Sequence, residues 1–279
     1  MRLWARENVA DQIFRYLLKN GAKANGAPGG RVSPLLRAVE KNDIGIVRVL
    51  LRYGGDVDVC DKRGRTALMT AAWKNHWHVL DELLKRGADV NKRDHKQRNV
   101  LHNLAADKLC NWGSSVIELL LRTNIAIDGP QGQDETRRTP LHWAASTGKK
   151  ELCEMLLARG ANINAVEAKE KTALHLAVTH GRDDMVELLI KYGANVHARS
   201  DGKWTALHNA CQQGSVKIVR TLLAVSTILR VLLDNALHTD RARFRNPSTY
   251  TSHSSTFSDL VTNFQSRNPP KSTPAFSTA

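Results

Sequence analysis

Pairs of apolar residues recur along most of the chain at intervals close to 33 residues. These pairs are Leu17-Leu18, Leu50-Leu51, Leu83-Leu84, Leu120-Leu121, Leu156-Leu157, Leu189-Ile190 and Leu222-Leu223. Five of the seven are followed three residues later by a glycine: Gly21, Gly54, Gly87, Gly160 and Gly193. Since glycine is the residue that most readily takes the left-handed conformation after a helix, we interpret each apolar pair as a helix end.

A second pattern with the same period precedes each apolar pair except the first. It begins at Ser33, Thr66, Asn99, Thr139, Thr172 and Thr205, spaced by 33 except for one gap of 40 after Asn99. Ser and Thr hydroxyls cap helix starts, and Pro34 and Pro140 fall where a helix tolerates a missing N–H. Small residues that allow close helix packing follow: Ala38, Ala71, Ala144, Ala177 and Ala210. The pattern predicts an all-α fold of helix–turn–helix units joined by hairpin loops.

These residues resemble the ankyrin repeat family, whose signature is T-P-L-H-x-A with a period of 33. The resemblance covers about residues 9–224 and is strongest over 139–164 and 172–197. It implies L-shaped units stacked into a curved solenoid, with the hairpin tips and first helices on the concave side. Physical reasoning agrees, because no single unit of this size can bury its apolar face alone.

The repeats predict two regions along the chain. Residues 1–235 form the repeat domain, with a degenerate cap at 1–25 and six repeats, of which the third carries insertions near 108–114 and 128–136. The apolar run 225–233 follows the last repeat, and we expect it to lengthen the final helix. Residues 236–279 are rich in Ser, Thr and Pro, so we expect a disordered tail.

No pattern of catalytic or metal-binding residues stands out, so we predict no enzyme activity, no cofactor and no metal. The repeated histidines are His102, His142, His175 and His208. Stacked helices lie about 8–10 Å apart, too far for neighbouring copies to share one ion. We therefore expect each histidine to hydrogen-bond within its own turn or to the next repeat.

The cysteines and the hydropathy pattern bear on the compartment. Four cysteines form no C-x-x-C pair, which favours reduced thiols. No apolar stretch is long enough for a membrane span, and residues 1–10 lack the apolar core of a signal peptide. We expect a cytoplasmic or nuclear protein that is not secreted.

The net charge of +14 points to acidic partners. The positions that the resemblance places on the concave face include twelve basic and four acidic residues. Solvated hairpin tips favour charge of any kind, an alternative that explains the charge but not its sign. The candidate partner-binding residues are Lys62, Arg63, Arg65, Trp73, Lys74, Arg93, Lys96, Arg98, Arg138, Lys169, Lys171, Arg199 and Trp204.

These residues predict a non-catalytic scaffold or adaptor that binds an acidic protein on a basic concave face. One alternative is a nucleic-acid or anionic-lipid binder, although 5% aromatic content disfavours stacking on single strands. Another is a regulatory subunit that occludes an enzyme or presents a substrate. Because the basic side chains are expected to point away from the core, reversing Arg63, Arg65, Arg93 and Arg98 to Glu should leave stability unchanged.

Overall fold

The computed structural model describes residues 12–26, 33–107, 114–128 and 132–226. All of them belong to the first of two compact units, Met1–Ser226. The predicted tail at 236–279 and the apolar run 225–233, apart from its first two residues, lie outside the described residues. The same holds for the first helix of the cap, because the described part of the chain begins at residue 12.

The described chain is a succession of short helices joined by turns and hairpins, which confirms the predicted all-α fold. The helices are α2 Pro34–Glu40, α3 Ile44–Arg52, α4 Ala67–Trp73, α5 Trp77–Lys85, α6 Val100–Ala106, α7 Ser114–Leu121, α8 Pro140–Thr147, α9 Lys150–Ala158, α10 Ala173–Thr179, α11 Asp183–Lys191 and α12 Ala206–Gln213. Residues 12–19 and 216–226 are also helical. In the described part of the chain, the single β-bridge pairs Cys60 with Thr66.

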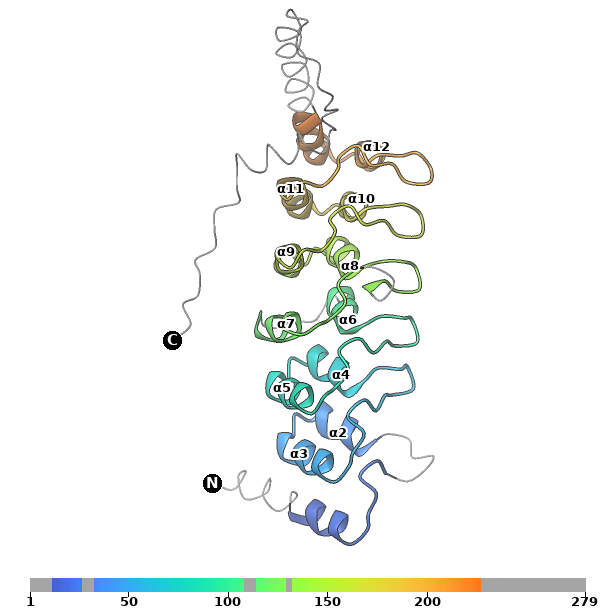
Figure 1. The fold of residues 1–279 in the computed structure, drawn as a ribbon. Helices are drawn as coiled ribbons and strands as arrows, with labels where there is room; N and C mark the ends of the chain where they lie inside the picture. Colours follow the sequence, from blue (N-terminus) through green and yellow to red (C-terminus); the bar gives the residue numbers. More distant parts are fainter. Residues whose placement is uncertain (1–11, 27–32, 108–113, 129–131, 227–279) are drawn as a thin grey trace, which may run out of the picture. The chain divides into compact units, whose positions relative to one another are not determined.

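The helices of the repeat unit form two rows. The even-numbered helices α2 to α12 contact one another in sequence order and make the inner row, while α3 to α11 make the outer row. Figure 1 shows the hairpin loops projecting from the inner row on the side away from the outer helices. Each hairpin therefore stands beside the hairpins of its neighbours, and the repeats together present a single edge of loops.

Small and branched side chains fill the space between the rows. Ala71, Ala144, Ala177 and Ala210 are completely buried, which confirms that the inner helices approach closely at these positions. Leu104 takes the corresponding place in the third repeat and is also completely buried. The apolar face of each repeat is thus covered by the next one, as expected for a stack in which units contact only their neighbours.

The predicted helix boundaries are found where the sequence placed them, but the Ser33 hydroxyl makes no capping hydrogen bond at the start of α2, contrary to the prediction. Thr66 caps α4 by accepting the Met69 N–H at 3.2 Å, and Pro34 and Pro140 stand in the first turns of α2 and α8. The glycines that follow the outer helices have positive φ, for example +80° at Gly54. These glycines allow the chain to leave each outer helix and enter the next hairpin.

The third repeat has a longer connection between its two helices. Its inner helix α6 ends at Ala106 and its outer helix α7 begins at Ser114, whereas Trp73 and Trp77 bound the corresponding turn of the second repeat. The insertion predicted near 108–114 falls almost wholly on 108–113, and part of the one predicted near 128–136 falls on 129–131; residues 108–113 and 129–131 lie outside the described residues. On both sides of them the stack continues, since α6 packs against α8 and α5 against α7.

Candidate protein-binding surface

A carboxylate at the base of most hairpins holds the loop in shape. Asp61 accepts the backbone N–H groups of Arg63 and Arg65 at 2.8 and 2.9 Å, and its own N–H donates to the Arg65 carbonyl. Partial burial would raise the pKa of Asp61, but these bonds and the charge of Arg65 lower it below its ordinary value. Asp94 and Asp134 repeat the arrangement in the next two hairpins. The loop tips are therefore pre-formed.

Three of the predicted partner-binding arginines form ion pairs with carboxylates at the hairpin bases. The ion pairs are Arg65–Asp61 at 2.7 Å, Arg98–Asp94 at 2.7 Å and Arg138–Glu167 at 2.8 Å. Asp94 and Glu167 are buried, so their arginines neutralise charges that would otherwise be unpaired. The expectation that reversing Arg65 and Arg98 leaves stability unchanged is therefore wrong, because each reversal would set a second carboxylate against the first.

Four of the other predicted cations lie at the loop tips and are exposed. Lys62 and Arg63 belong to the first described tip, Lys96 to the second and Lys169 to the fourth. In the first two hairpins the Asp61 and Asp94 carboxylates bind the backbone of the tip rather than the side chains of Arg63 and Lys96, which stay exposed. These four residues are where the predicted basic face is most available.

The tips are tied to one another through the backbone. The connecting bonds run from His95 N to Arg63 O at 3.0 Å, Glu135 N to Lys96 O at 3.2 Å, Ala168 N to Thr136 O at 3.0 Å and Asp201 N to Lys169 O at 3.1 Å. At the first of them Gly64, with φ +76°, allows the close approach, since a Cβ there would lie 2.7 Å from the His95 ring. The tips therefore form one continuous strip.

Trp73 lies at the end of α4 with cations on its ring. The Lys74 ammonium is 4.8 Å from the ring centroid and the Arg65 guanidinium 5.9 Å, distances typical of cation–π contacts. Its indole N–H donates to the Asp107 carboxylate. The side chain is still 38% exposed. The Arg65 contact places this indole beside the first described hairpin.

The other candidate residues do not gather around Trp73. Trp204 is exposed and belongs to the last hairpin, which leads into α12; the inner helices α6, α8 and α10 separate α12 from α4. Arg199 is exposed and close to Trp204 in the chain. Lys171 and Arg93 are half-buried at hairpin bases. The thirteen predicted residues thus divide into an amino-terminal group around the first two tips and a group toward the last hairpin.

The sequence reasoning missed Trp143 and the structural carboxylates. The Trp143 ring lies 5.0 Å from the Arg138 guanidinium, and its N–H donates to Asp134 at 2.8 Å. Burial would raise the pKa of Asp134, but its hydrogen bonds to Thr136, Trp143 and the Arg138 backbone lower it. The available signal was the recurrence of an acidic residue four positions before a basic one, at 61, 94, 134 and 167.

The repeated histidines serve the stack, as predicted. In His175 the Nε2–H donates to the Trp204 carbonyl at 3.1 Å, so Nδ1 must accept from the Thr172 N–H at 3.2 Å and from its hydroxyl at 2.9 Å. Burial lowers the pKa of His175, and it lowers that of His102 to about 4. Burial thus favours the neutral form of His102, His142 and His175. No group of three metal-ligating side chains occurs in the described residues.

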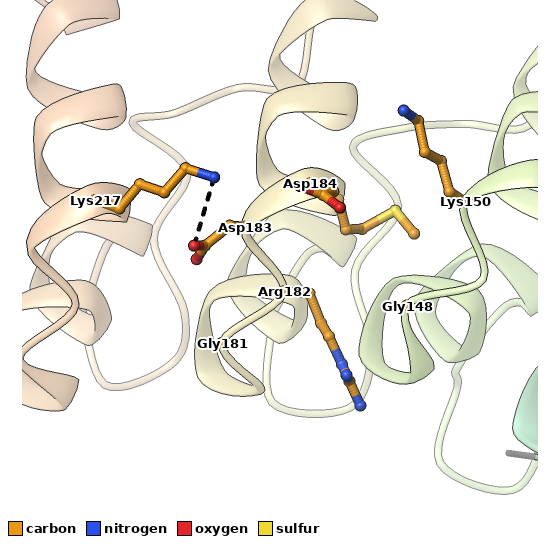
Figure 2. A pocket seen from close by; sticks show the side chains of 8 residues that line it. Gly148, Lys150, Gly181, Arg182, Asp183, Asp184 and Lys217 are labelled. Atoms are coloured by element: carbon orange, nitrogen blue, oxygen red, sulfur yellow. Dashed lines mark ion pairs between the residues drawn. The ribbon is translucent and has the colours of Figure 1, made fainter.

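Apart from the hairpin edge, a cavity is found among the turns at which the outer helices begin. Gly148, Lys150, Arg182 and Asp184 are among the residues that line a cavity of about 360 Å³ there (Figure 2). Its Lys217 pairs with Asp183 at 3.6 Å and with Glu187 at 3.4 Å. The lining holds three cations, Lys150, Arg182 and Lys217, against the carboxylates of Asp183 and Asp184, so its charges nearly balance.

The repeated helix pair, the capping Thr–His turn and the tied hairpins define a helical repeat protein. The family model described as "Ankyrin repeats (3 copies)" matches residues 3–94, 92–167 and 164–231. The chain belongs to the ankyrin repeat family, as its sequence predicted. Proteins of this family are generally protein–protein interaction modules and typically lack enzymatic activity.

Several known proteins resemble the chain. The ankyrin repeat protein FPV022 of Fowlpox virus (strain NVSL) is 27% identical over 156 residues, which are 56% of this chain and 24% of that protein. The chain thus spans about a quarter of the length of this relative. None of the described helices is long and apolar enough to cross a membrane.

Solved ankyrin repeat domains share the fold. That of Bcl-3, a member of the IkappaB family, has a TM-score of 0.67 and 24% identity, covering 79% of this chain and 94% of that domain. The domain of human ASB11 has a TM-score of 0.59 and 26% identity, covering 69% and 83%. A domain from Acinetobacter baumannii AYE, ABAYE2397, has a TM-score of 0.61 and 29% identity, covering 69% and 97%.

Proposed function

We propose that the protein is a non-catalytic scaffold or adaptor that binds an acidic protein surface through its hairpin edge. The observation that carries the proposal is the set of exposed cations on a strip of tied loop tips, at Lys62, Arg63, Lys96 and Lys169. A pre-formed strip with an excess of positive charge attracts acidic partners and disfavours basic ones. Because the tips are held by backbone bonds, little conformational entropy is lost on binding.

Nucleic acid or anionic lipid is the second candidate, because either would meet the same cations. Readers of single strands combine basic groups with successive aromatic platforms. Along this edge the exposed indoles Trp73 and Trp204 stand at separate places in the stack rather than in succession. A protein partner is therefore favoured.

Affinity purification with mass spectrometry tests the proposal. The whole chain is compared with a variant in which Lys62, Arg63, Lys96 and Lys169 are reversed to Glu, after nuclease treatment of the extract. We expect the wild type to capture acidic proteins that the variant does not capture. A captured protein, once purified, should bind the purified wild-type chain reversibly. The proposal fails if captured proteins are the same for both forms. It also fails if binding to DNA is micromolar or tighter with a log–log salt slope of several units.

A further inference from the structure

The basic residues along the hairpin edge are not evenly distributed once the internal ion pairs are taken into account. Arg65, Arg98 and Arg138 are bound to carboxylates of their own chain at 2.7–2.8 Å. What a partner meets is therefore set by the exposed tip residues. The first tip carries Lys62 and Arg63, and the second carries Lys96.

The three later tips are balanced in charge. Each carries one exposed acidic and one exposed basic residue: Glu135 with Arg137, Glu170 with Lys169, and Asp201 with Lys203. Opposite charges at the same tip partly cancel in the field that an approaching partner meets. The attraction for an acidic partner is thus concentrated on the first two tips.

Those two tips are joined in a fixed geometry. His95 donates its backbone N–H to the Arg63 carbonyl at 3.0 Å, and Gly64 leaves the space that this contact needs. The Asp61 and Asp94 carboxylates hold the two loops from beneath. The three cations at Lys62, Arg63 and Lys96 therefore stand on one rigid platform.

An apolar surface adjoins this platform. Trp73 is 38% exposed, and its ring is in contact range of Lys74 and of Arg65 at the base of the first hairpin. Trp and Arg are the residues most often found at binding hot spots, because they bury a large area around a polar handle. The indole N–H is already given to Asp107, so the exposed part of Trp73 is its apolar ring.

We propose that Lys62, Arg63, Lys96 and Trp73, the amino-terminal ridge, recognise an acidic protein segment that carries one apolar side chain among its carboxylates. The carboxylates lie over the tip cations and the apolar side chain packs on the indole. This proposal rests on the proposed function and assigns it to one part of the edge. The later tips, from residue 135 onward, shape the edge without contributing net attraction.

Fluorescence anisotropy of labelled synthetic peptides tests the location. The probe is an Asp/Glu-rich peptide with a single leucine, titrated with the whole chain. We expect Lys62→Glu, Arg63→Glu and Lys96→Glu together to weaken binding about tenfold or more. The matched control reverses Lys169, Arg199 and Lys203, which changes the net charge equally, and should weaken binding by less than about threefold. Thermal melts check that both variants remain folded.

The indole is tested with a second peptide in which serine replaces the leucine. We expect the wild type to prefer the leucine peptide by about tenfold, the factor that partial burial of one apolar side chain supplies. Trp73→Ala should abolish this preference and Trp73→Phe should retain most of it, although phenylalanine cannot bind Asp107. A preference that survives in Trp73→Ala overturns the assignment of the apolar contact.

The outcomes separate this inference from the proposed function. Equal losses in the two charge-reversal variants would mean that the whole edge attracts the partner, so the amino-terminal ridge is refuted and the proposed function stands. If neither peptide binds the wild type while a thymidine oligonucleotide or phosphatidylserine vesicles do, both proposals are refuted. Selective loss in the Lys62, Arg63 and Lys96 variant, with unchanged melting, supports both.

Discussion

Replacing Thr172 with alanine tests the contact that both starts an inner helix and orients a buried histidine. Thr172 is completely enclosed at the start of α10, and its hydroxyl lies 2.9 Å from His175 Nδ1. Because Nε2–H of the same ring donates to the Trp204 carbonyl, the hydroxyl must donate to Nδ1. The substitution therefore removes one bond within the repeat and loosens the ring that connects it to the next repeat.

The expected cost follows from these contacts. Loss of a Thr cap costs about 0.5–2 kcal/mol, and one hydrogen bond in a buried place is worth about 1 kcal/mol. The Thr172 N–H still donates to Nδ1 at 3.2 Å, so the ring is not left without a partner. We therefore expect a loss of about 1–2 kcal/mol. With a urea dependence of about 2 kcal/mol per molar, the unfolding midpoint should fall by about 0.5–1 M.

Urea denaturation followed by circular dichroism measures this shift. Thr172→Ser keeps the hydroxyl and should recover most of the stability. Thr205→Ala removes the same bond, 2.8 Å from Thr205 Oγ1 to His208 Nδ1, but His208 is exposed, so its cost should be smaller. Equal midpoints for wild type and Thr172→Ala, or a Thr172→Ser variant as unstable as the alanine form, would refute the reasoning.

Three other outcomes follow from the structure. Burial lowers the pKa of His102 from 6.5 to about 4, so between these pH values the unfolded chain takes up a proton at this residue more readily than the folded chain does. The free energy of unfolding should therefore fall by roughly 3 kcal/mol from pH 6.5 to pH 4. His102→Gln should flatten this pH dependence, as measured by urea titrations at each pH. Arg98→Ala leaves the buried Asp94 without its ion pair and should cost about 1–3 kcal/mol, whereas Lys96→Ala at the exposed tip should change stability by less than about 0.5 kcal/mol, both measured by chemical denaturation. Leu80→Ala empties a completely buried place in α5 and should cost about 2–5 kcal/mol in the same assay, and a cost below about 1 kcal/mol would contradict the packing described for the outer row.

The fold could be predicted because two independent patterns share one period. The Thr caps, the small alanines and the glycines after the outer helices each meet a requirement of the local backbone or of close helix packing. Such requirements can be recognised from the residue types at fixed positions in the sequence. The burial of Leu104 in place of alanine also follows from its position in the repeat.

Whether a basic residue is ion-paired or exposed was harder to predict, since it depends on contacts across a loop or between repeats. Arg65 and Arg63 look equivalent in the sequence, yet Arg65 pairs with Asp61 at 2.7 Å and Arg63 is exposed at the tip. Arg138 pairs not with an acid of its own hairpin but with Glu167 of the next, 29 positions later. Such pairings follow from loop geometry, so spacing alone did not separate structural arginines from those that a partner can reach.

The histidine contacts between repeats also bear on how such a surface can change over evolutionary time. His102, His142 and His175 donate to the main-chain carbonyls of Arg138, Lys171 and Trp204, three chemically different residues at one repeat position. Because the acceptor is a main-chain carbonyl, the bond does not depend on which side chain the accepting residue carries. Mutations at that position therefore leave this bond between repeats in place, although at Arg98 and Arg138 the side chain is also needed for its own ion pair.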